Sequence, residues 1–294
     1  MSEPFWERNL IYRVVIGSQA YGLANAQSDL DTCGVCIPPR RYLLGLTPFE
    51  QQVTHGTERD TVVYALVKFA WLALECNPNI IEALYVEPGH ILYCNAYGER
   101  LRAARQLFLT RQAGQTFSGY AISQLRRLER HHRWLVHPPE HQPTQEEFGG
   151  RATEGRYKFP DHDSEATYRS ALKHWNHYQV WRRDRNPARA ELEARYGYDT
   201  KHAMHLLRLL RMGMEILETG EVHVYRPDRE WLLGVRNGLL EYEELLALAA
   251  EYEARLAILQ AASTLPEAPE VEQVEALVIA LQEDYLWAAR ESRV

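Results

Sequence analysis

Two apolar runs near the start of the chain have the pattern of strands, and a polar turn separates them. The first covers residues 10–16, is rich in β-branched side chains and ends at Gly17, as a strand does where it enters a tight turn. The second covers residues 33–37 and follows a D-L-D sequence whose acids are Asp29 and Asp31. Because residues i and i+2 of a strand share a face, we expect Asp29 and Asp31 to lie side by side.

Farther along, the pattern predicts two more short strands and then a succession of helices. The strands are expected over residues 50–54 and 59–64, and an apolar helix follows over residues 65–75. From about residue 98 the apolar positions recur with the 3.6-residue period of helices. The later elements expected are helices over 97–109, 118–135, 164–185, 188–196, 199–211, 241–262 and 270–290, and a short strand or hairpin over 221–225.

This change of character predicts an α+β fold with two domains. Residues 1–98 should form a mixed sheet with helices, and residues 99–294 a mostly α-helical, Arg-rich domain that supplies the other wall of a cleft. Residues 137–163 carry many Pro, Gly and charged residues with little periodicity. A connection of that length inside a compact domain is usually functional, so we expect a mobile flap there.

The first turn and the two acids that follow it carry the strongest chemical signal. Backbone N–H groups at Gly17 and Ser18 would point outward where a short helical stretch begins, which suits an anion. Two carboxylates as close as Asp29 and Asp31 repel each other unless a cation compensates, and Mg²⁺ prefers such oxygen ligands. The arrangement therefore predicts a site for a metal-bound triphosphate. The alternative is an ordinary turn with turn-forming acids.

Residues 17–31, G-S-Q-A-Y-G-L-A-N-A-Q-S-D-L-D, resemble the signature of the DNA polymerase β-type nucleotidyltransferase superfamily. Within that superfamily the stretch is most similar to the group associated with RNA ligases and RNA repair. Residues 68–82, 117–125 and 199–209 resemble the same group. The resemblance implies an N-terminal polymerase-β-like nucleotidyltransferase domain, and an enzyme that moves a nucleoside monophosphate from an NTP to a hydroxyl group and releases pyrophosphate.

The superfamily places a third carboxylate on a strand near the D-x-D strand, where it completes the metal site or acts as a base. Asp60 is the first candidate because it begins an apolar run just before a helix. Glu58 lies two residues earlier and could share its face, and Glu82 is the other candidate. Each of the three could instead be a surface acid or a helix-start residue.

The helix expected over residues 199–211 has one cationic and one apolar face. At 100° per residue, Lys201, His205 and Arg208 fall within about 60° of one another. The opposite side carries Ala203, Leu206, Leu207, Leu210 and Met214. We expect the cationic stripe to face outward, and the resemblance places it at nucleotide or RNA phosphates. A merely solvated face is one alternative, and zinc at His202 and His205 is another, although no acidic third ligand stands at helical spacing.

The charge distribution changes what the net charge implies about partners. A net charge of −7 argues against nucleic acid. However, residues 99–134 carry eight Arg and two Glu, residues 182–211 carry eight basic and four acidic side chains, and residues 241–294 carry twelve acidic and three basic ones. Arg also outnumbers Lys 29 to 4, which favours bidentate contacts with phosphate. The two basic middle segments therefore favour RNA as the acceptor.

Cysteine usage and hydropathy predict a cytoplasmic protein with no membrane segment. Cys33 and Cys36 form a C-x-x-C sequence, but positions three apart in a strand face opposite sides. We therefore expect small core residues there rather than a redox or zinc pair. No apolar stretch approaches the roughly 18 residues of a membrane span, and the N-terminus lacks a targeting pattern.

Together these observations predict a metal-dependent nucleotidyltransferase that acts on an RNA 3′ end, with a tRNA-like acceptor. The implied cofactor is Mg²⁺ or Mn²⁺, the expected NTP is ATP or CTP, and the resemblance implies a functional association with an RNA ligase. Transfer of AMP to a protein or small-molecule hydroxyl and a non-catalytic RNA-binding role are the alternatives. The expected catalytic and metal-binding residues are Asp29, Asp31 and Asp60, and the expected nucleotide-binding residues are Gly17, Ser18, Tyr21, Ser28, Lys201, His205 and Arg208.

Overall fold

A mixed five-stranded sheet forms the centre of the N-terminal part of the chain. A computed structural model describes residues 4–26, 28–56, 59–153 and 156–291. The strands are β1 Leu10–Ile16, β2 Leu30–Cys36, β3 Gln51–His55, β4 Arg59–Ala65 and β5 Ile91–Cys94, in the spatial order β3-β4-β2-β1-β5. β1 pairs antiparallel with β2 and β5, whereas β2 and β4 run parallel. This arrangement brings the ends of β1, β2 and β4 together.

Helices cover the sheet and fill its connections. They are α1 Phe5–Arg8, α2 Gly17–Tyr21, α3 Arg40–Leu44, α4 Leu66–Leu74, α5 Pro78–Tyr85 and α6 Ala96–Ala103, with short 3₁₀ turns η1 Pro88–His90 and η2 Arg105–Phe108. α5 packs against β1, and α4 packs against β2 and β4. α5 begins where the Asn77 side chain accepts the Asn79 N–H, with proline at the first helical position.

The remaining core is helical and is organised around α10. Its elements are α7 Gln112–Val136, α9 Pro187–Tyr196, α10 Thr200–Thr219, α11 Arg229–Arg236 and α12 Tyr242–Ala262. α10 contacts the other four. It begins where the Asp199 side chain accepts the His202 N–H, which is the cap that the sequence predicts. Because neighbours surround α10, its buried residues spread well beyond one stripe of the helix.

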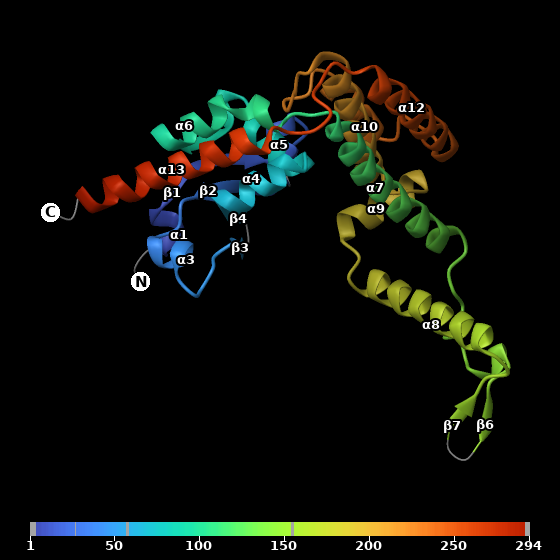
Figure 1. Ribbon diagram of the computed structural model, residues 1–294. Helices are drawn as coiled ribbons and strands as arrows, with labels where there is room; N and C mark the ends of the chain where they lie inside the picture. The colour runs from blue at the N-terminus through green and yellow to red at the C-terminus, as the bar shows by residue number, and fades with distance from the viewer. Residues whose placement is uncertain (1–3, 27, 57–58, 154–155, 292–294) are drawn as a thin grey trace.

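The last helix returns to the first part of the fold. α13 Val271–Glu291 packs against α4, α6 and η2, and Figure 1 shows it lying across these elements. One continuous group of buried apolar side chains extends from the sheet through the helical region to α13. The division into residues 1–98 and 99–294 stays a prediction about sequence segments, whereas the packing joins the final helix to the first segment.

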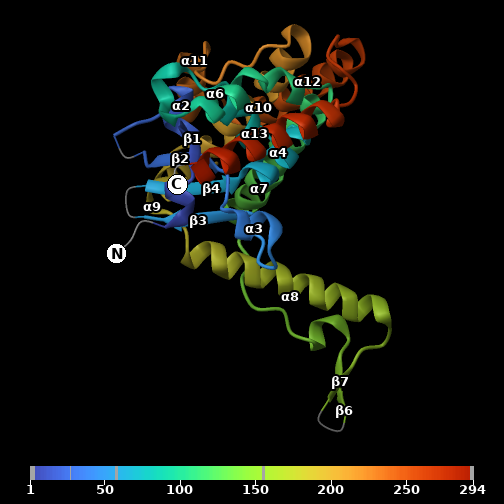
Figure 2. The same cartoon turned by 60° about the vertical axis from the view of Figure 1, so that its left-hand side comes forward.

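An arm projects from the helical region (Figures 1 and 2). It contains η3 Glu146–Phe148, a hairpin of β6 Arg151–Thr153 and β7 Arg156–Lys158, and the long helix α8 His162–Arg183. Tyr178 is the buried residue of α8. The segment 137–163 expected as a structureless flap therefore contains a short hairpin, and its mobility stays a prediction.

Three local predictions differ from the structure. The expected strand over residues 221–225 is wrong: Val222 and Val224 are buried in alternation, as in a strand, but they lie on the helical core with no paired strand among the described residues. The sequence predicts a loop from residue 38 to about residue 48, with Pro38 and Pro39 at its start, but the short helix α3 lies there. β5 was not predicted, because its partner β1 supplies the pairing that its short sequence cannot specify.

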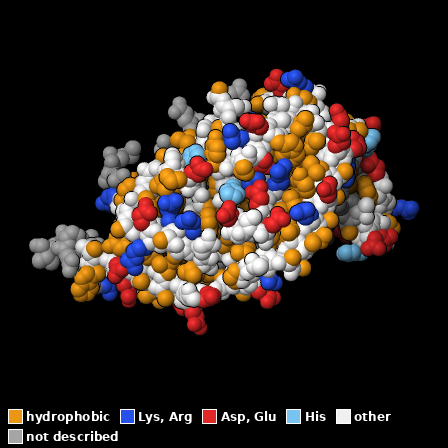
Figure 3. Space-filling view, turned by 90° about the horizontal axis from the view of Figure 1, so that it is seen from above, with side chains coloured by type: hydrophobic (Ala, Val, Ile, Leu, Met, Phe, Trp, Pro, Cys, Tyr) orange, Lys and Arg blue, Asp and Glu red, His pale blue; other side chains and the backbone are white. Residues whose placement is uncertain are grey.

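Surface charge is mixed rather than segregated on the face seen in Figure 3. Basic and acidic side chains there are interspersed with hydrophobic ones among the described residues. The basic segments of the sequence therefore do not produce one continuous basic field on this face. No helix in the described ranges has both the length and the apolar character needed to cross a membrane.

Candidate active site

The turn from β1 into α2 approaches the acids of β2 closely. Gly17 has a φ of +71°, a conformation that L side chains rarely adopt. A Cβ atom on Gly17 would lie 3.0 Å from Asp31 Oδ2, so a side chain here would meet the carboxylate. Glycine is therefore required at this position both by the backbone and by the neighbouring acid. α2 starts without a side-chain cap among the described residues.

Three carboxylates gather where β2 and β4 begin. Asp31 on β2 stands beside Asp60 on β4 in the parallel register, and Asp29 directly precedes β2. Partial burial, the negative charge of Asp60 and that of Asp29, in that order, raise the pKa of Asp31, while Lys201 opposes the shift. The charges of Asp60 and Asp29 thus act on Asp31, while the roles of the three acids in a metal site stay predictions.

These carboxylates suit a divalent cation in chemistry, although they do not form a ready-made cage. Among the described residues, no three His, Cys, Asp or Glu side chains converge closely enough to hold a metal ion as they stand. Asp60 Oδ1 lies 3.2 Å from His55 Nδ1 in an exposed pair. A bound Mg²⁺ or Mn²⁺ would attract carboxylate oxygens that otherwise repel one another. This set of donor atoms therefore fits such an ion.

The structure separates the three candidates for the third carboxylate. Asp60 is the one in register with Asp31. Glu82 on α5 is buried, and its two oxygens accept hydrogen bonds from the Tyr21 hydroxyl and the Arg208 guanidinium. Glu82 is therefore committed to a buried ion pair. Glu58 lies outside the described residues, and the role of Asp60 stays a prediction.

Lys201 faces the carboxylates from the helical side. It lies near the start of α10, is half-buried, and interacts electrostatically with Asp29 and Asp31. Its ammonium group forms no ion pair within the described part of the chain. Burial, followed by the charges of Arg189 and Arg236, lowers the pKa of Lys201. Arg189 of α9 and Arg236 of α11 thus act electrostatically on Lys201, which itself acts on Asp29 and Asp31.

Sequence reasoning missed Arg189 and Arg236. Arg189 lies on α9 and bonds the Asp199–His202 pair, and Arg236 ends α11 and donates to the Leu23 carbonyl at 3.2 Å. Neither belongs to a motif, because each reaches Lys201 only through helix packing. The basic composition of residues 182–211 is a signal for Arg189, whereas no sequence signal points to Arg236.

The predicted outward stripe of α10 needs correction at two of its three positions. Arg208 is 4% exposed and pairs with Glu82, so it does not face solvent. His205 is partly exposed, but burial of its ring, together with the charges of Arg208 and Lys201, lowers its pKa to about 3. It is therefore neutral at pH 7. The helical wheel predicts which residues share a face of α10 but not what packs against that face. Of the three stripe residues, Lys201 is the one cation without an ion pair within the described part of the chain.

The other predicted nucleotide-binding residues make structural contacts. Tyr21 is buried, and its hydroxyl donates to Glu82. The Ser28 hydroxyl accepts the Asn25 N–H and bonds the Asn25 side chain, which closes the turn before Asp29. Their contact with nucleotide stays a prediction, as does that of Ser18.

Neither alternative metal site is present among the described residues. His202 is buried and bonded to Asp199 and Arg189, which leaves it no freedom to hold zinc together with His205. Cys33 and Cys36 are free and buried, and burial raises the pKa of each thiol to about 12. They are small core residues, as their strand position predicts.

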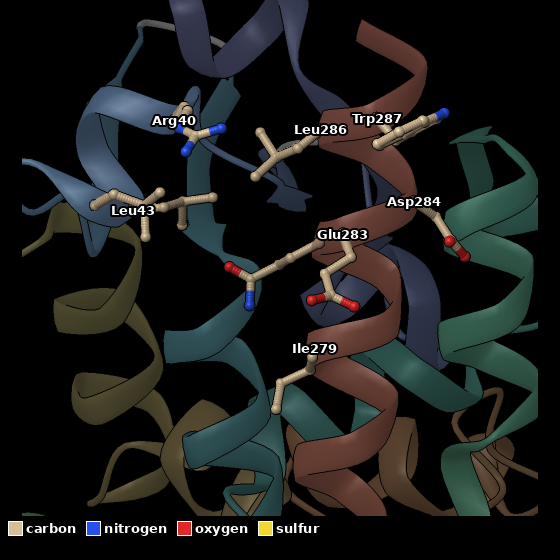
Figure 4. A pocket seen from close by; sticks show the side chains of 9 residues that line it. Arg40, Leu43, Ile279, Glu283, Asp284, Leu286 and Trp287 are labelled. Atoms are coloured by element: carbon tan, nitrogen blue, oxygen red, sulfur yellow. The ribbon is translucent and has the colours of Figure 1, made fainter. Parts of the chain in front are cut away.

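A sizeable cavity lies away from the carboxylates. It has a volume of about 600 Å³ and lies between α3 and α13 (Figure 4). Its walls are formed by Arg40, Leu43, Leu44, Ile279, Gln282, Glu283, Asp284, Leu286 and Trp287. None of the predicted site residues lines this cavity.

Comparison with known proteins identifies the family. No curated protein matches the chain. A solved structure, a nucleotidyltransferase-like protein from Exiguobacterium sibiricum, is 15% identical, covering 96% of this chain and 74% of its own, at a TM-score of 0.26; we draw nothing further from that likeness. The RNA repair pathway DNA polymerase beta family (RlaP) matches residues 3–280. The chain therefore belongs to the RNA repair pathway DNA polymerase β family, a polymerase-β-like nucleotidyltransferase family.

Proposed function

We propose that the protein is a metal-dependent enzyme that transfers a nucleoside monophosphate from an NTP to the 3′ hydroxyl of an RNA. The observation that carries this proposal is the gathering of Asp29, Asp31 and Asp60 opposite Lys201. Acids on one side and cations on the other complement a metal-bound triphosphate, which carries both signs of charge.

In this proposal the acids at the sheet would bind the metal, and Gly17 and Lys201 would contact the phosphates. Asp29, Asp31 and Asp60 would hold Mg²⁺ or Mn²⁺, which when bound neutralises phosphate charge and polarises the phosphorus centre under attack. Gly17 would let phosphate oxygens approach the backbone, since it has no side chain in the way. Lys201 would bind phosphate oxygens from the helical side.

The RNA acceptor is proposed on two grounds. The family is named for an RNA repair pathway, and two middle segments of the chain are basic. A tRNA-like 3′ end, ATP or CTP as the NTP and a functional association with an RNA ligase complete the proposal. A protein or small-molecule hydroxyl would need the same acids but not the basic segments, so it is the second candidate.

Labelled transfer assays test the proposal directly. The protein is incubated with Mg²⁺ and each α-labelled NTP, and is offered tRNA, tRNA lacking its 3′ end, or total cell protein. Asp29→Ala/Asp31→Ala removes the acids, and Asp163→Ala/Glu165→Ala on the projecting arm is the matched control for charge. We expect label on RNA that the first variant abolishes and the control retains.

Other outcomes redirect or overturn the assignment. Label on protein would favour the second candidate. RNA binding through phosphates should weaken steeply as salt rises, whereas a small-molecule acceptor should show no such dependence. Undiminished transfer by Asp29→Ala/Asp31→Ala would contradict the site.

A further inference from the structure

A buried cluster of three polar side chains joins the two sides of the candidate site. The Tyr21 hydroxyl on α2 donates to Glu82 Oε2 at 2.5 Å, and Arg208 Nη1 on α10 donates to Glu82 Oε1 at 2.5 Å. The Arg208 guanidinium lies over the Tyr21 ring, 3.8 Å from its centroid. The exposed fractions of the three are 5%, 2% and 4%. The cluster therefore connects α2, α5 and α10 through contacts that exclude water.

The cluster lies between the two groups that the proposed reaction needs. Tyr21 ends the five-residue helix that begins at Gly17 and Ser18. Arg208 lies seven residues after Lys201 on α10, which is two turns or about 10 Å along the axis and on the same side of the helix. The Arg208–Glu82 ion pair, through its contacts with Tyr21, thus links α2, which begins beside Asp31, to α10, which carries Lys201.

α2 depends on outside contacts for its position. A helix of five residues is far too short to be stable alone. Beyond the cluster, the Tyr21 carbonyl accepts the Arg226 N–H at 3.1 Å, and the Tyr225 ring lies against Gly22, where a Cβ would come within 2.6 Å of it. The other end of α2 has no side-chain cap among the described residues. The contacts of Tyr21 and Gly22 therefore fix the end of α2, in addition to the packing of Ala20 and Leu23, which are both fully buried, on the core.

The buried polar groups of the cluster are not explained by a gain in packing stability. Arg208 Nε is buried and has no hydrogen-bond partner in the described part of the chain. Replacing a buried ion pair by apolar side chains of similar volume is often neutral or stabilising. A planar guanidinium, together with a carboxylate that accepts a hydrogen bond at each oxygen, instead fixes the geometry between the helices that carry these groups.

We infer that Glu82 and Arg208 are positioning residues, which act through Tyr21 to hold the Gly17–Ser18 turn at a set distance from Lys201. This inference rests on the proposed function, because the distance matters only if both groups contact the same triphosphate. It replaces the direct phosphate contact predicted for Arg208 with an indirect role. Misplacing a binding group by about 1 Å can cost on the order of 100-fold in rate.

A triple variant separates positioning from packing. Tyr21→Phe/Glu82→Leu/Arg208→Met removes all the polar groups of the cluster together, so that no buried charge is left unpaired. Arg185→Met/Glu193→Leu is the matched control, because it removes a pair in which the buried Glu193 of α9 binds Arg185, a residue between α8 and α9, and none of its hydrogen bonds or ion pairs in the described part of the chain involves α2. Thermal unfolding is measured first, and both variants are expected to keep a cooperative transition near that of the native protein.

Two readouts then decide the inference. Hydrogen exchange at the amides of residues 18–23 is measured without nucleotide, and we expect it to be faster by about tenfold or more in the triple variant only. The kcat/KM of nucleotidyl transfer should fall on the order of 100-fold in the triple variant and stay unchanged in the control. Tyr21→Phe alone, which removes one hydroxyl, gives a smaller change in the same direction if the triple variant fails to fold.

The outcomes distinguish this inference from the proposed function. Native exchange at residues 18–23 in the variants would overturn it whatever the activity. Faster exchange with undiminished transfer would overturn it too, because α2 would then be held without consequence for the reaction. If the native protein shows no transfer at all, the proposed function fails, and the exchange data alone decide whether the cluster holds α2.

Discussion

The two sides of the candidate site differ in how their charges come together. On the sheet side, Asp29 and Asp31 are two residues apart, and strand pairing adds Asp60 beside them. On the helical side, Lys201 meets Arg189 and Arg236 from separate helices. The acids therefore depend on local geometry and one register, whereas the cations depend on how α9, α10 and α11 pack. This difference explains why the sequence predicts one side far better than the other.

On each side of the candidate site, the surroundings disfavour the charged form of the central residue. Mutual repulsion contributes to the raised pKa of Asp31, and neighbouring cations contribute to the lowered pKa of Lys201. In both cases burial is the first cause, so neither group gains from its position in the protein alone. A ligand with both positive and negative charges, such as a metal-bound triphosphate, would compensate the negative charges around Asp31 and the positive charges around Lys201.

Removing the central acid should have the largest effect. Asp31→Asn is expected to reduce nucleotidyl transfer roughly 1,000-fold, because a ligand and charge partner of the metal is lost. The same change should raise the melting temperature, since the repulsion from Asp60 and Asp29 disappears. Asp163→Asn, at an exposed acid of the arm, is the control and should change neither. A lower melting temperature for Asp31→Asn would contradict the electrostatic account.

Breaking the buried pair between the sides should cost the most stability. Arg208→Ala leaves the Glu82 carboxylate buried without its partner, so we expect a loss of about 3–5 kcal/mol in the free energy of unfolding. Arg255→Ala removes a pair with Glu218 whose side chains are 59% and 54% exposed, and should cost less than about 1 kcal/mol. Urea unfolding of the two variants gives the comparison. Equal losses would show that burial does not distinguish these pairs.

Neutralising the free cation should act on substrate binding more than on folding. Lys201→Met is expected to weaken NTP binding about 10- to 100-fold, measured by titration with Mg²⁺ present, because it removes a charge-assisted contact worth about 1.5–3 kcal/mol. Lys173→Met on α8 makes the same chemical change at an exposed position. Comparable losses of affinity in both variants would indicate a non-specific charge effect.

The smallest effect expected is a pH dependence on the helical side. Burial opposes ionisation of Asp199, but the hydrogen bond and charge of His202 outweigh it and lower the pKa of Asp199 to about 2. A depressed carboxyl pKa stabilises the fold above its unfolded value near 4, and this contribution is lost as pH falls from about 4 to about 2.

That contribution is about 2 kcal/mol. Asp199→Asn should therefore unfold more easily than the native protein at pH 6, with the difference shrinking by pH 2 to 3. Urea unfolding at both pH values measures it. A difference that is constant across this range would show that Asp199 acts as a cap for α10 and not through its charge.

The elements that sequence patterns predict well are those with long or repeated signals. Strands β1, β2 and β4 and helices α8, α12 and α13 lie where the periodicity places them, within a few residues. Helix α7 begins six residues before its expected range, and α10 ends eight residues after its own. The errors occur where a short pattern of apolar residues is compatible with two different structures. Val222 and Val224 alternate as in a strand, but their partners are helices.

Sequence by itself predicted the acids Asp29 and Asp31, the glycine before them and the family, because each of these rests on short motifs that are contiguous in the chain. Only the tertiary structure decided that Arg208 pairs with Glu82 inside the protein, that Arg189 and Arg236 join Lys201, and that α13 packs on the first part of the fold. A helix pattern specifies which residues share a face. It does not specify which neighbour covers that face, since that depends on contacts between separate segments of the chain.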